Sequence, residues 1–265
     1  MTNDGSAMFT AAAAEHYDRH VGRYNAQLAR SLMALAGVRP GQRALDVGCG
    51  PGALTHELAA VLGPEHVAAV DPSPSFVAAA RERLPGVDVR VASAEQLPFG
   101  NDTFDHALAQ LVVNFMADAP SGIAEMARVT RPGGRVSAAT WDYGEGMTFL
   151  RHFWDAAIAL DAAAVASDEA VTMSYCRPDE LRDLLDAEGL VDVAVDSAEP
   201  RASYANLDDL WLPIMGGIGP SGVYLRSLDT AQQAALKLEF GRLLGVGDEP
   251  FELIARAWLA TGEVA

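Results

Sequence analysis

The chain has 265 residues, half of them hydrophobic, which is enough to bury one substantial core. It carries 36 Asp and Glu residues against 19 Lys and Arg residues, so its formal net charge is −17. So acidic a surface disfavours a nucleic-acid substrate. No apolar run in the sequence reaches the roughly 18 residues that a membrane span needs.

Residues 1–40 are predicted to form an N-terminal helical segment. From residue 43 onward, short apolar runs alternate with amphipathic segments, a pattern typical of strand-helix-strand units in a parallel sheet. The predicted strands, each bounded by Gly, Pro, Asp or Asn, cover residues 43–48, 66–71, 87–93, 105–111 and 134–140. Residues 41–141 therefore form the predicted core of the sheet.

The rhythm changes after Trp141. Residues 147–166 read as one long helix where a simple alternating sheet would return to a strand, so an insertion is predicted over 142–176. A surface helix, a sixth strand over 191–199, a second insertion over 203–248 and a last strand from Phe251 follow. The expected fold is one α/β domain, 1–265, with a doubly wound, mostly parallel seven-stranded sheet. The two insertions and residues 1–40 are predicted to form a helical cap.

The stretch GCGPGA, residues 48–53, matches the pattern G-x-G-x-x-G/A at the end of the first strand. Glycines there let a ligand approach the backbone, and the helix that follows begins with unpaired N–H groups. Asp71 follows about 20 residues later, at the end of the second strand. By itself this turn admits a nicotinamide-dependent dehydrogenase.

Asp46 changes the balance between cofactors. It lies two positions before the first glycine, where a carboxylate opposes a bound diphosphate. The same charge favours a cofactor that carries an ammonium and a sulfonium group, which indicates S-adenosylmethionine. Asp71 suits either cofactor, because a carboxylate accepts hydrogen bonds from ribose hydroxyls.

Four segments in order strengthen this interpretation: LDVGCGPG (45–52), AAVDPSPS (68–75), ASAEQLPFGNDTFDHALAQ (92–110) and RVTRPGGRV (128–136). With these segments the chain resembles the class I S-adenosylmethionine-dependent methyltransferases, specifically methyltransferase type 11, the ubiquinone/menaquinone-type small-molecule branch. The resemblance covers roughly residues 15–141, about half of the chain. Four motifs at compatible spacing are far more specific than one glycine turn.

The resemblance implies a Rossmann-like methyltransferase fold, S-adenosyl-L-methionine as cofactor and S-adenosyl-L-homocysteine as product. It implies that Asp46, Gly48 and Gly50 line the methionine end of the cofactor. It also implies that Asp71 binds the ribose and that Pro72 borders the adenine.

Further along the chain, the resemblance places Ala94 and Glu95 beside the adenine and Gln110 near the sulfonium. Ser93 stands where many relatives have an Asp that accepts a hydrogen bond from the adenine amino group. A hydroxyl is a weaker acceptor than a carboxylate, so this contact departs from the family pattern.

Methyl transfer from a sulfonium is an in-line displacement whose leaving group is already activated. Holding the reactants aligned and dry is enough, so no dedicated catalytic residue is required and none is assigned. If the acceptor must lose a proton, His16, His20 and His152 are the weak candidates for a general base. They fall in the N-terminal segment and the first insertion, and each also suits a surface or packing role.

The insertions are rich in large apolar side chains, and Trp141 and Tyr143 follow the fifth strand where ligand crevices open. These residues indicate a small, apolar or aromatic methyl acceptor, although the same side chains also suit the core of the cap itself. No Asn/Asp-Pro-Pro-Tyr/Phe stretch follows the fourth strand, where LVVNFM stands instead. The absence of this nucleobase-methylation motif adds to the case against a nucleic-acid partner.

The predicted function is therefore O-, N- or C-methylation of a small organic molecule. A nicotinamide-dependent oxidoreductase and a non-methylating protein that binds S-adenosylmethionine remain the alternatives. Cys49 and Cys176 lack metal-site spacing, so no metal is expected, and two cysteines fit a reducing cytoplasm. One lysine against 18 arginines indicates a GC-rich, bacterial genome. The sequence leaves the oligomeric state open.

Overall fold

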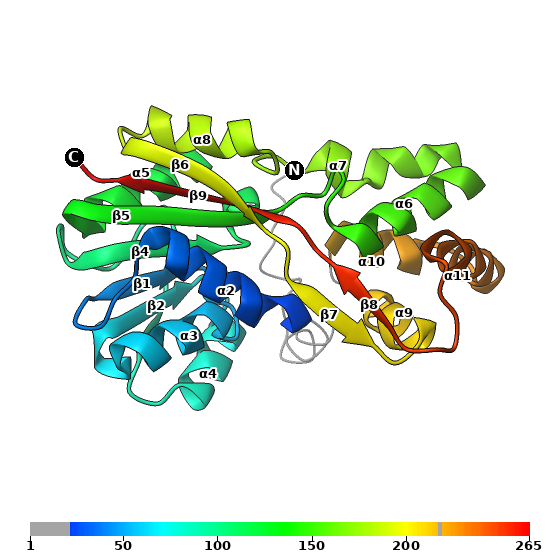
Figure 1. Ribbon diagram of the computed structural model, residues 1–265, viewed down its shortest axis with the longest axis horizontal. Helices are drawn as coiled ribbons and strands as arrows, with labels where there is room; N and C mark the ends of the chain where they lie inside the picture. The colour runs from blue at the N-terminus through cyan, green and yellow to red at the C-terminus, as the bar shows by residue number, and fades with distance from the viewer. Residues whose placement is uncertain (1–21, 217–218) are drawn as a thin grey trace.

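A seven-stranded sheet forms the centre of the protein, whose computed structural model describes residues 22–216 and 219–265 (Figure 1). Its strands lie in the order β3-β2-β1-β4-β5-β9-β6. Their bounds are β1 Ala44–Val47, β2 Val67–Asp71, β3 Asp88–Val91, β4 Phe104–Gln110, β5 Thr130–Trp141, β6 Val191–Ala198 and β9 Ala257–Glu263. Only β9 runs antiparallel to its neighbours, which confirms the predicted doubly wound, mostly parallel sheet.

The strand order reverses between β1 and β4, because the chain builds the sheet outward from β1 in one direction and then from β4 in the other. In this pair Asp46 lies opposite Leu108, so both strands end at the same edge. Crevices that bind ligands form at such switch points, outside the carboxyl ends of the strands.

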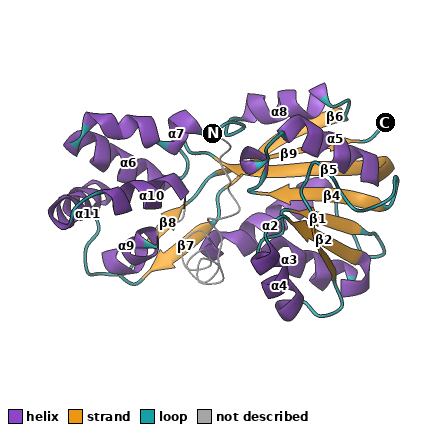
Figure 2. Ribbon diagram, turned by 180° about the vertical axis from the view of Figure 1, so that it is seen from behind, coloured by secondary structure: helices purple, strands orange, loops and turns teal. Residues whose placement is uncertain are grey.

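Helices cover both faces of the sheet (Figures 1 and 2). One face packs against α2 Gly22–Ala36, α3 Ala53–Leu62 and α4 Pro74–Arg83, the other against α5 Ala119–Val129 and α8 Pro178–Ala187. Short 3-10 turns are η2 Pro64–His66 and η3 Val113–Phe115. Local signals set the helix starts: Ser73 accepts a hydrogen bond from the Phe76 N–H, with Pro74 in the first turn.

A second group of elements, here called the helical lobe, lies beyond the carboxyl ends of β4 and β5, on the right in Figure 1. It consists of α6 Thr148–Leu160, η4 Ala162–Ser167, α7 Glu169–Thr172, α9 Leu207–Met215, α10 Gly219–Ser227, α11 Thr230–Leu244 and the two-stranded sheet of β7 Arg201–Tyr204 and β8 Phe251–Ile254. Its core is aromatic, with Phe153 contacting Trp154, Trp211 and Phe240.

The described part of the N-terminal segment does not belong to the lobe. Helix α2 packs on the sheet beside α3 and reaches the lobe with its N-terminal half, where the Gln27 side chain hydrogen-bonds to the main chain of Arg201 on β7. There Arg23 forms an ion pair with Asp209 at 2.5 Å, and the Tyr24 and Tyr204 hydroxyls lie 3.1 Å apart. These contacts fasten the lobe to the sheet.

Three local predictions were wrong. The helix expected over 147–166 ends at Leu160. There the Asp161 side chain accepts a hydrogen bond from the Ala163 N–H, and the short helix η4 begins instead. The single last strand is two strands in different sheets, since the chain crosses from the lobe to the central sheet at Ala255 and Arg256. Strand β7, only four residues long, was not predicted.

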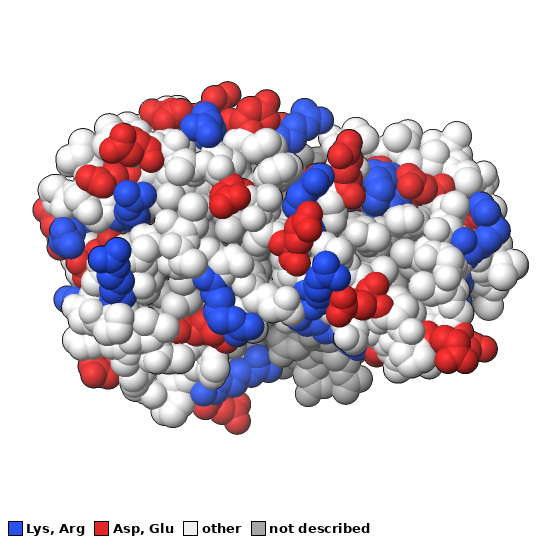
Figure 3. All heavy atoms as spheres, in the orientation of Figure 1, with Lys and Arg blue, Asp and Glu red and all other residues white. Residues whose placement is uncertain are grey.

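Acidic and basic side chains are interspersed over the face that Figure 3 shows. Among the described residues, no helix combines the length and the apolar character that crossing a membrane requires.

Candidate functional site

The glycine turn between β1 and α3 is built from backbone conformations that favour glycine. Gly48, Gly50 and Gly52 have φ angles of 74°, 52° and 99°, all left-handed. The Gly48 N–H donates to the Val70 carbonyl at 2.8 Å, which ties the turn to β2. A Cβ on Gly48 would lie 2.4 Å from the Val112 side chain, so packing alone requires glycine there.

Gly50 differs from Gly48, because among the described residues, its own chain neighbours aside, no atom lies within 4 Å of the place its Cβ would occupy. The helix that follows, α3, has Gly52 at its N-cap and no side chain that caps it. Its first N–H groups are therefore available to an anionic group outside the helix, such as a carboxylate. The turn combines an open surface at Gly50 with the positive end of a helix.

Asp71 connects this turn to the end of β2. One carboxylate oxygen accepts from the Gly50 N–H at 2.9 Å, and the other accepts from the Ser73 N–H at 2.8 Å. Burial raises the pKa of Asp71, while the hydrogen bonds from Ser73 and Gly50 oppose that shift. Each oxygen keeps a second lone pair, so Asp71 can hold the turn and accept hydrogen bonds from a ligand together.

Asp46 lies deeper than its sequence position indicates. It is 1% exposed, and its carboxylate accepts a hydrogen bond from the Thr55 hydroxyl at 2.5 Å. Burial raises its pKa to about 7, although the Thr55 hydrogen bond opposes this. A carboxyl that is partly protonated at neutral pH repels a diphosphate less than the sequence argument assumed. Its bond to Thr55 instead fixes the first turn of α3 below Gly50.

Gln110 ends β4 and faces α2. Its Nε2 donates to the main-chain carbonyl of Asn25 at 3.3 Å. The side chains of Gln110 and Asn25 are 9% and 4% exposed, and within the described ranges neither Gln110 Oε1 nor Asn25 Oδ1 has a hydrogen-bond partner. Two buried acceptors without donors are costly unless a ligand supplies the donor. Sequence reasoning missed Asn25, because only the packing of α2 on the sheet brings it to β4.

The loop after β3 places its predicted residues in different surroundings. Ala94 is buried against α5, and Ser93 is half-buried. Glu95 accepts hydrogen bonds from the N–H groups of Ala117 and Asp118, at 2.9 and 3.2 Å, so it positions the loop before α5. Pro72, directly after Asp71, is exposed.

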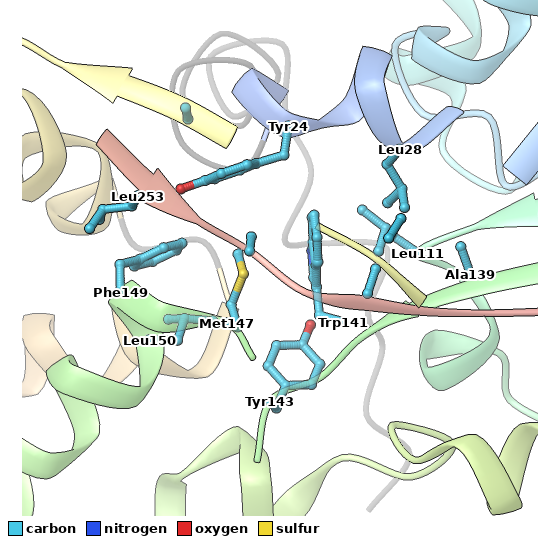
Figure 4. Close-up of a cluster of buried hydrophobic side chains, with 14 of the residues drawn as sticks. Tyr24, Leu28, Leu111, Ala139, Trp141, Tyr143, Met147, Phe149, Leu150 and Leu253 are labelled. Atoms are coloured by element: carbon cyan, nitrogen blue, oxygen red, sulfur yellow. The ribbon is translucent and has the colours of Figure 1, made fainter. Parts of the chain in front are cut away.

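An apolar wall lies where the sheet meets the helical lobe (Figure 4). Trp141 ends β5, Tyr143 and Met147 follow it, and all three are buried. The Trp141 ring contacts the Tyr24 ring edge to face at 5.8 Å between centroids. Leu111, next to Gln110, has a left-handed φ of 62°, which is uncommon for a leucine. The other large side chains considered from the sequence belong mostly to the core of the lobe itself: Phe149, Phe153, Trp154, Trp211 and Tyr224.

The weak general-base candidates are not brought together by the part of the fold that is described. His16 and His20 lie outside the described residues. His152 sits on α6, where its Nδ1 is 2.7 Å from the Thr148 carbonyl of its own helix. Within residues 22–216 and 219–265, no group of three or more His, Cys, Asp or Glu side chains is arranged to hold a metal ion.

The chain is similar to known proteins in sequence and in fold. Residues 45–138 match the family model for a methyltransferase domain, Methyltransf_11. The chain is 31% identical over 146 residues to malonyl-[acyl-carrier protein] O-methyltransferase of Serratia marcescens, covering 53% of this chain and 56% of that protein. It is 29% identical over 201 residues to the ubiquinone/menaquinone biosynthesis C-methyltransferase of Ectopseudomonas mendocina (strain ymp). This match covers 72% of this chain and 78% of that protein.

A solved structure of similar fold is phosphoethanolamine N-methyltransferase 2 of Haemonchus contortus, in complex with phosphomonomethylethanolamine and S-adenosylhomocysteine. The TM-score is 0.56 at 17% identity, over 90% of this chain and 53% of that one. Curated relatives with 31 to 39% identity match over only 32 to 56% of their own length.

The strand order, the glycine turn and the sequence matches show a methyltransferase domain with the class I fold. Within the chain, residues 45–138 match the methyltransferase type 11 domain, a stretch that runs from the glycine turn into the fifth strand of the chain.

Proposed function

We propose that the protein transfers a methyl group from S-adenosylmethionine to a small organic acceptor with an apolar or aromatic surface. One observation carries this proposal: Gly50 is open to a ligand directly beside the Asp71 carboxylate, at the switch point of the sheet. A closed turn with no room over Gly50 would serve only to connect β1 to α3.

The chemistry of the surrounding groups fits this cofactor. Asp71 has lone pairs left for two ribose hydroxyls, and the uncapped start of α3 suits the carboxylate of the methionine part. Gln110 Oε1 and Asn25 Oδ1 have no donor among the residues that the structure describes, and an ammonium group carries three. We assign the methionine end to Gly48, Gly50 and these two acceptors.

The part of the proposed cofactor site that would hold the adenine has fewer polar groups than the part that would hold the ribose and the methionine. We place the adenine between exposed Pro72 and the backbone of Ser93 and Ala94, with Glu95 shaping the pocket through the loop it holds. The Ser93 hydroxyl is the available side-chain acceptor for the adenine amino group. Asp46 contributes indirectly, by fixing Thr55 and the start of α3.

S-adenosylmethionine supplies a methyl group that is already activated for transfer. The protein then has to orient the acceptor and exclude water, tasks that suit Trp141, Tyr143 and Met147 at the edge of the helical lobe. We infer that the lobe is the cap over the acceptor. Related proteins named as O-, C- and N-methyltransferases leave the methylated atom open.

Calorimetry tests the cofactor first. We expect saturable binding of S-adenosylhomocysteine and none of NADH, and binding of NADH alone would overturn the proposal in favour of an oxidoreductase. Methyl transfer from S-adenosylmethionine to a panel of small phenols, quinols, amines and carboxylic acids tests the reaction. Cofactor binding with no methylated product from any acceptor class would support a non-methylating role instead. The predicted cytoplasmic location stays a prediction.

A further inference from the structure

A second pocket of about 330 Å³ opens at the opposite edge of the sheet, where β1, β4 and β5 begin. It lies between the end of α2, the start of β4 and the first residues of β5. His106 lines it from β4, four residues before Gln110, which corresponds to about 13 Å along the strand. The pocket is therefore separate from the methyl-transfer site.

The pocket is basic in a strongly acidic protein. Arg39, Arg131 and Arg135 line it, together with one carboxylate, Asp105. Asp105 is already engaged, because it accepts from Arg131 Nε at 2.7 Å and from the Arg43 N–H at 2.7 Å. The charge of one arginine is thus balanced inside the pocket, and two remain.

The two remaining arginines are weakly neutralised. Arg135 lies 3.6 Å from a carboxylate oxygen of Glu263, a loose contact between half-exposed groups. Arg39 is exposed and makes no ion pair with any carboxylate in the described ranges. On a chain of net charge −17, unbalanced guanidinium groups that converge on a pocket indicate a site for an anion.

His106 adds an unusual buried polar group. It is 4% exposed, and its Nε2 lies 3.1 Å from Gln42 Oε1. This amide oxygen can only accept hydrogen bonds, and it also accepts one from the Arg39 main-chain N–H at 2.6 Å. The Nε2 atom therefore carries the hydrogen. Nδ1 is buried and has no partner in the part of the chain that the structure describes.

We propose that this pocket binds a small phosphate-bearing molecule. Guanidinium groups match phosphate oxygens with paired, charge-assisted hydrogen bonds, and the volume is at the lower end for small-ligand sites. A nucleic-acid phosphate backbone is a poor alternative, because the rest of the acidic surface repels it.

Binding also affects His106. Its pKa is lowered by burial first and then by the charges of Arg131 and Arg135, against the opposing effect of Asp105. A bound phosphate, together with Asp105, offsets the field of Arg39, Arg131 and Arg135. We therefore expect the pKa of His106 to rise on binding, so that binding is accompanied by proton uptake at pH values between the pKa of the free protein and that of the complex.

The test uses the full chain and inorganic pyrophosphate at low ionic strength. We expect saturable heat at millimolar or lower concentration and an upward shift of the His106 pKa, followed by NMR of the ring. The double variant Arg39→Gln/Arg135→Gln should weaken binding at least tenfold and leave S-adenosylhomocysteine affinity unchanged. Arg242→Gln, an exposed arginine on α11, is the matched control.

Absence of saturable pyrophosphate binding, or equal affinity in the double variant and the control, would overturn the assignment. Citrate serves as the second arm: if it binds as tightly as pyrophosphate, the site recognises anions in general and the assignment to phosphate is wrong. Because the readout is pyrophosphate binding, it does not depend on whether the protein transfers methyl groups.

Discussion

Gln110 at the end of β4 donates a hydrogen bond to the main-chain carbonyl of Asn25 on α2, although 85 residues separate the two in sequence. The bond brings two amide oxygens, Gln110 Oε1 and Asn25 Oδ1, to the edge of the sheet where the cofactor is proposed to lie, and neither has a donor in the described part of the chain. Such buried, unpaired acceptors lower the stability of a protein and are retained where a ligand uses them.

Replacement of Gln110 by Met should separate stability from function. The change removes a buried acceptor without a donor, so we expect the free energy of unfolding of the ligand-free protein to stay constant or rise by about 1 kcal/mol. Affinity for S-adenosylhomocysteine should fall about tenfold or more, because one charge-assisted hydrogen bond is lost. Urea unfolding and calorimetry measure the two effects. A parallel loss of stability and affinity would show that Gln110 is only a structural residue.

Gly48→Ala and Gly50→Ala should behave differently despite similar sequence positions. At Gly48 the new Cβ would lie 2.4 Å from Val112, so we expect a stability loss of roughly 2 to 4 kcal/mol from strain and overpacking. At Gly50 the added methyl meets open space, and only the left-handed backbone costs about 1 kcal/mol. Gly50→Ala should nevertheless weaken S-adenosylhomocysteine binding strongly. Unchanged affinity in a folded Gly50→Ala protein would contradict the placement of the ligand over this residue.

Asp71→Ala should reduce S-adenosylhomocysteine affinity by about ten- to a hundredfold, or roughly 1.4 to 3 kcal/mol, since it removes the acceptor for the ribose and the bond that holds Gly50. Asp71→Asn keeps one acceptor oxygen, so its affinity for S-adenosylhomocysteine should lie between that of Asp71→Ala and that of the unmodified protein. The control is Asp88→Ala on β3, an exposed carboxylate that pairs with Arg90. Equal calorimetric affinities for Asp71→Ala and the unmodified protein would rule out the ribose role.

Stability should fall as the pH rises through the range in which Asp46 titrates. Its pKa is raised from the usual 3.8 to about 7 by burial, so below pH of about 4 both the folded and the unfolded states are protonated. Between these values only the unfolded state ionises, and the free energy of unfolding drops by up to about 1.4 kcal/mol per pH unit. Asp46→Asn should flatten this slope between pH values of about 4 and 7 in urea titrations.

Glu169 provides the comparison for that experiment. It is buried in the helical lobe, where it accepts hydrogen bonds from Trp154 Nε1 and the Ser221 N–H, and burial raises its pKa to about 7 as well. Glu169→Gln should flatten the pH slope in the same direction and leave S-adenosylhomocysteine affinity unchanged. If neither variant alters the slope, the two carboxyls are ionised in the folded protein throughout this pH range.

Several features follow from local sequence because local chemistry determines them. The glycine turn requires left-handed backbone at Gly48 and Gly50, and only certain residues tolerate it. Short, mostly apolar runs such as β1 and β2, whose only polar residues are Asp46 and Asp71, are buried on both faces, which is typical of strands at the centre of a parallel sheet. The sheet and the Asp71 position could therefore be predicted without coordinates.

The remaining features depend on contacts between distant segments, which no local pattern records. Asn25 reaches Gln110 only because α2 packs across the sheet, and the pKa of Asp46 is raised because the fold buries its carboxyl group. The basic pocket likewise needs Arg39 and Arg135 to meet across separate turns. By itself the sequence determined the sheet, the glycine turn and the probable class of cofactor, since these rest on local backbone and burial preferences. Only the tertiary structure decided which polar atoms are left without partners, because burial and hydrogen bonding depend on the whole fold.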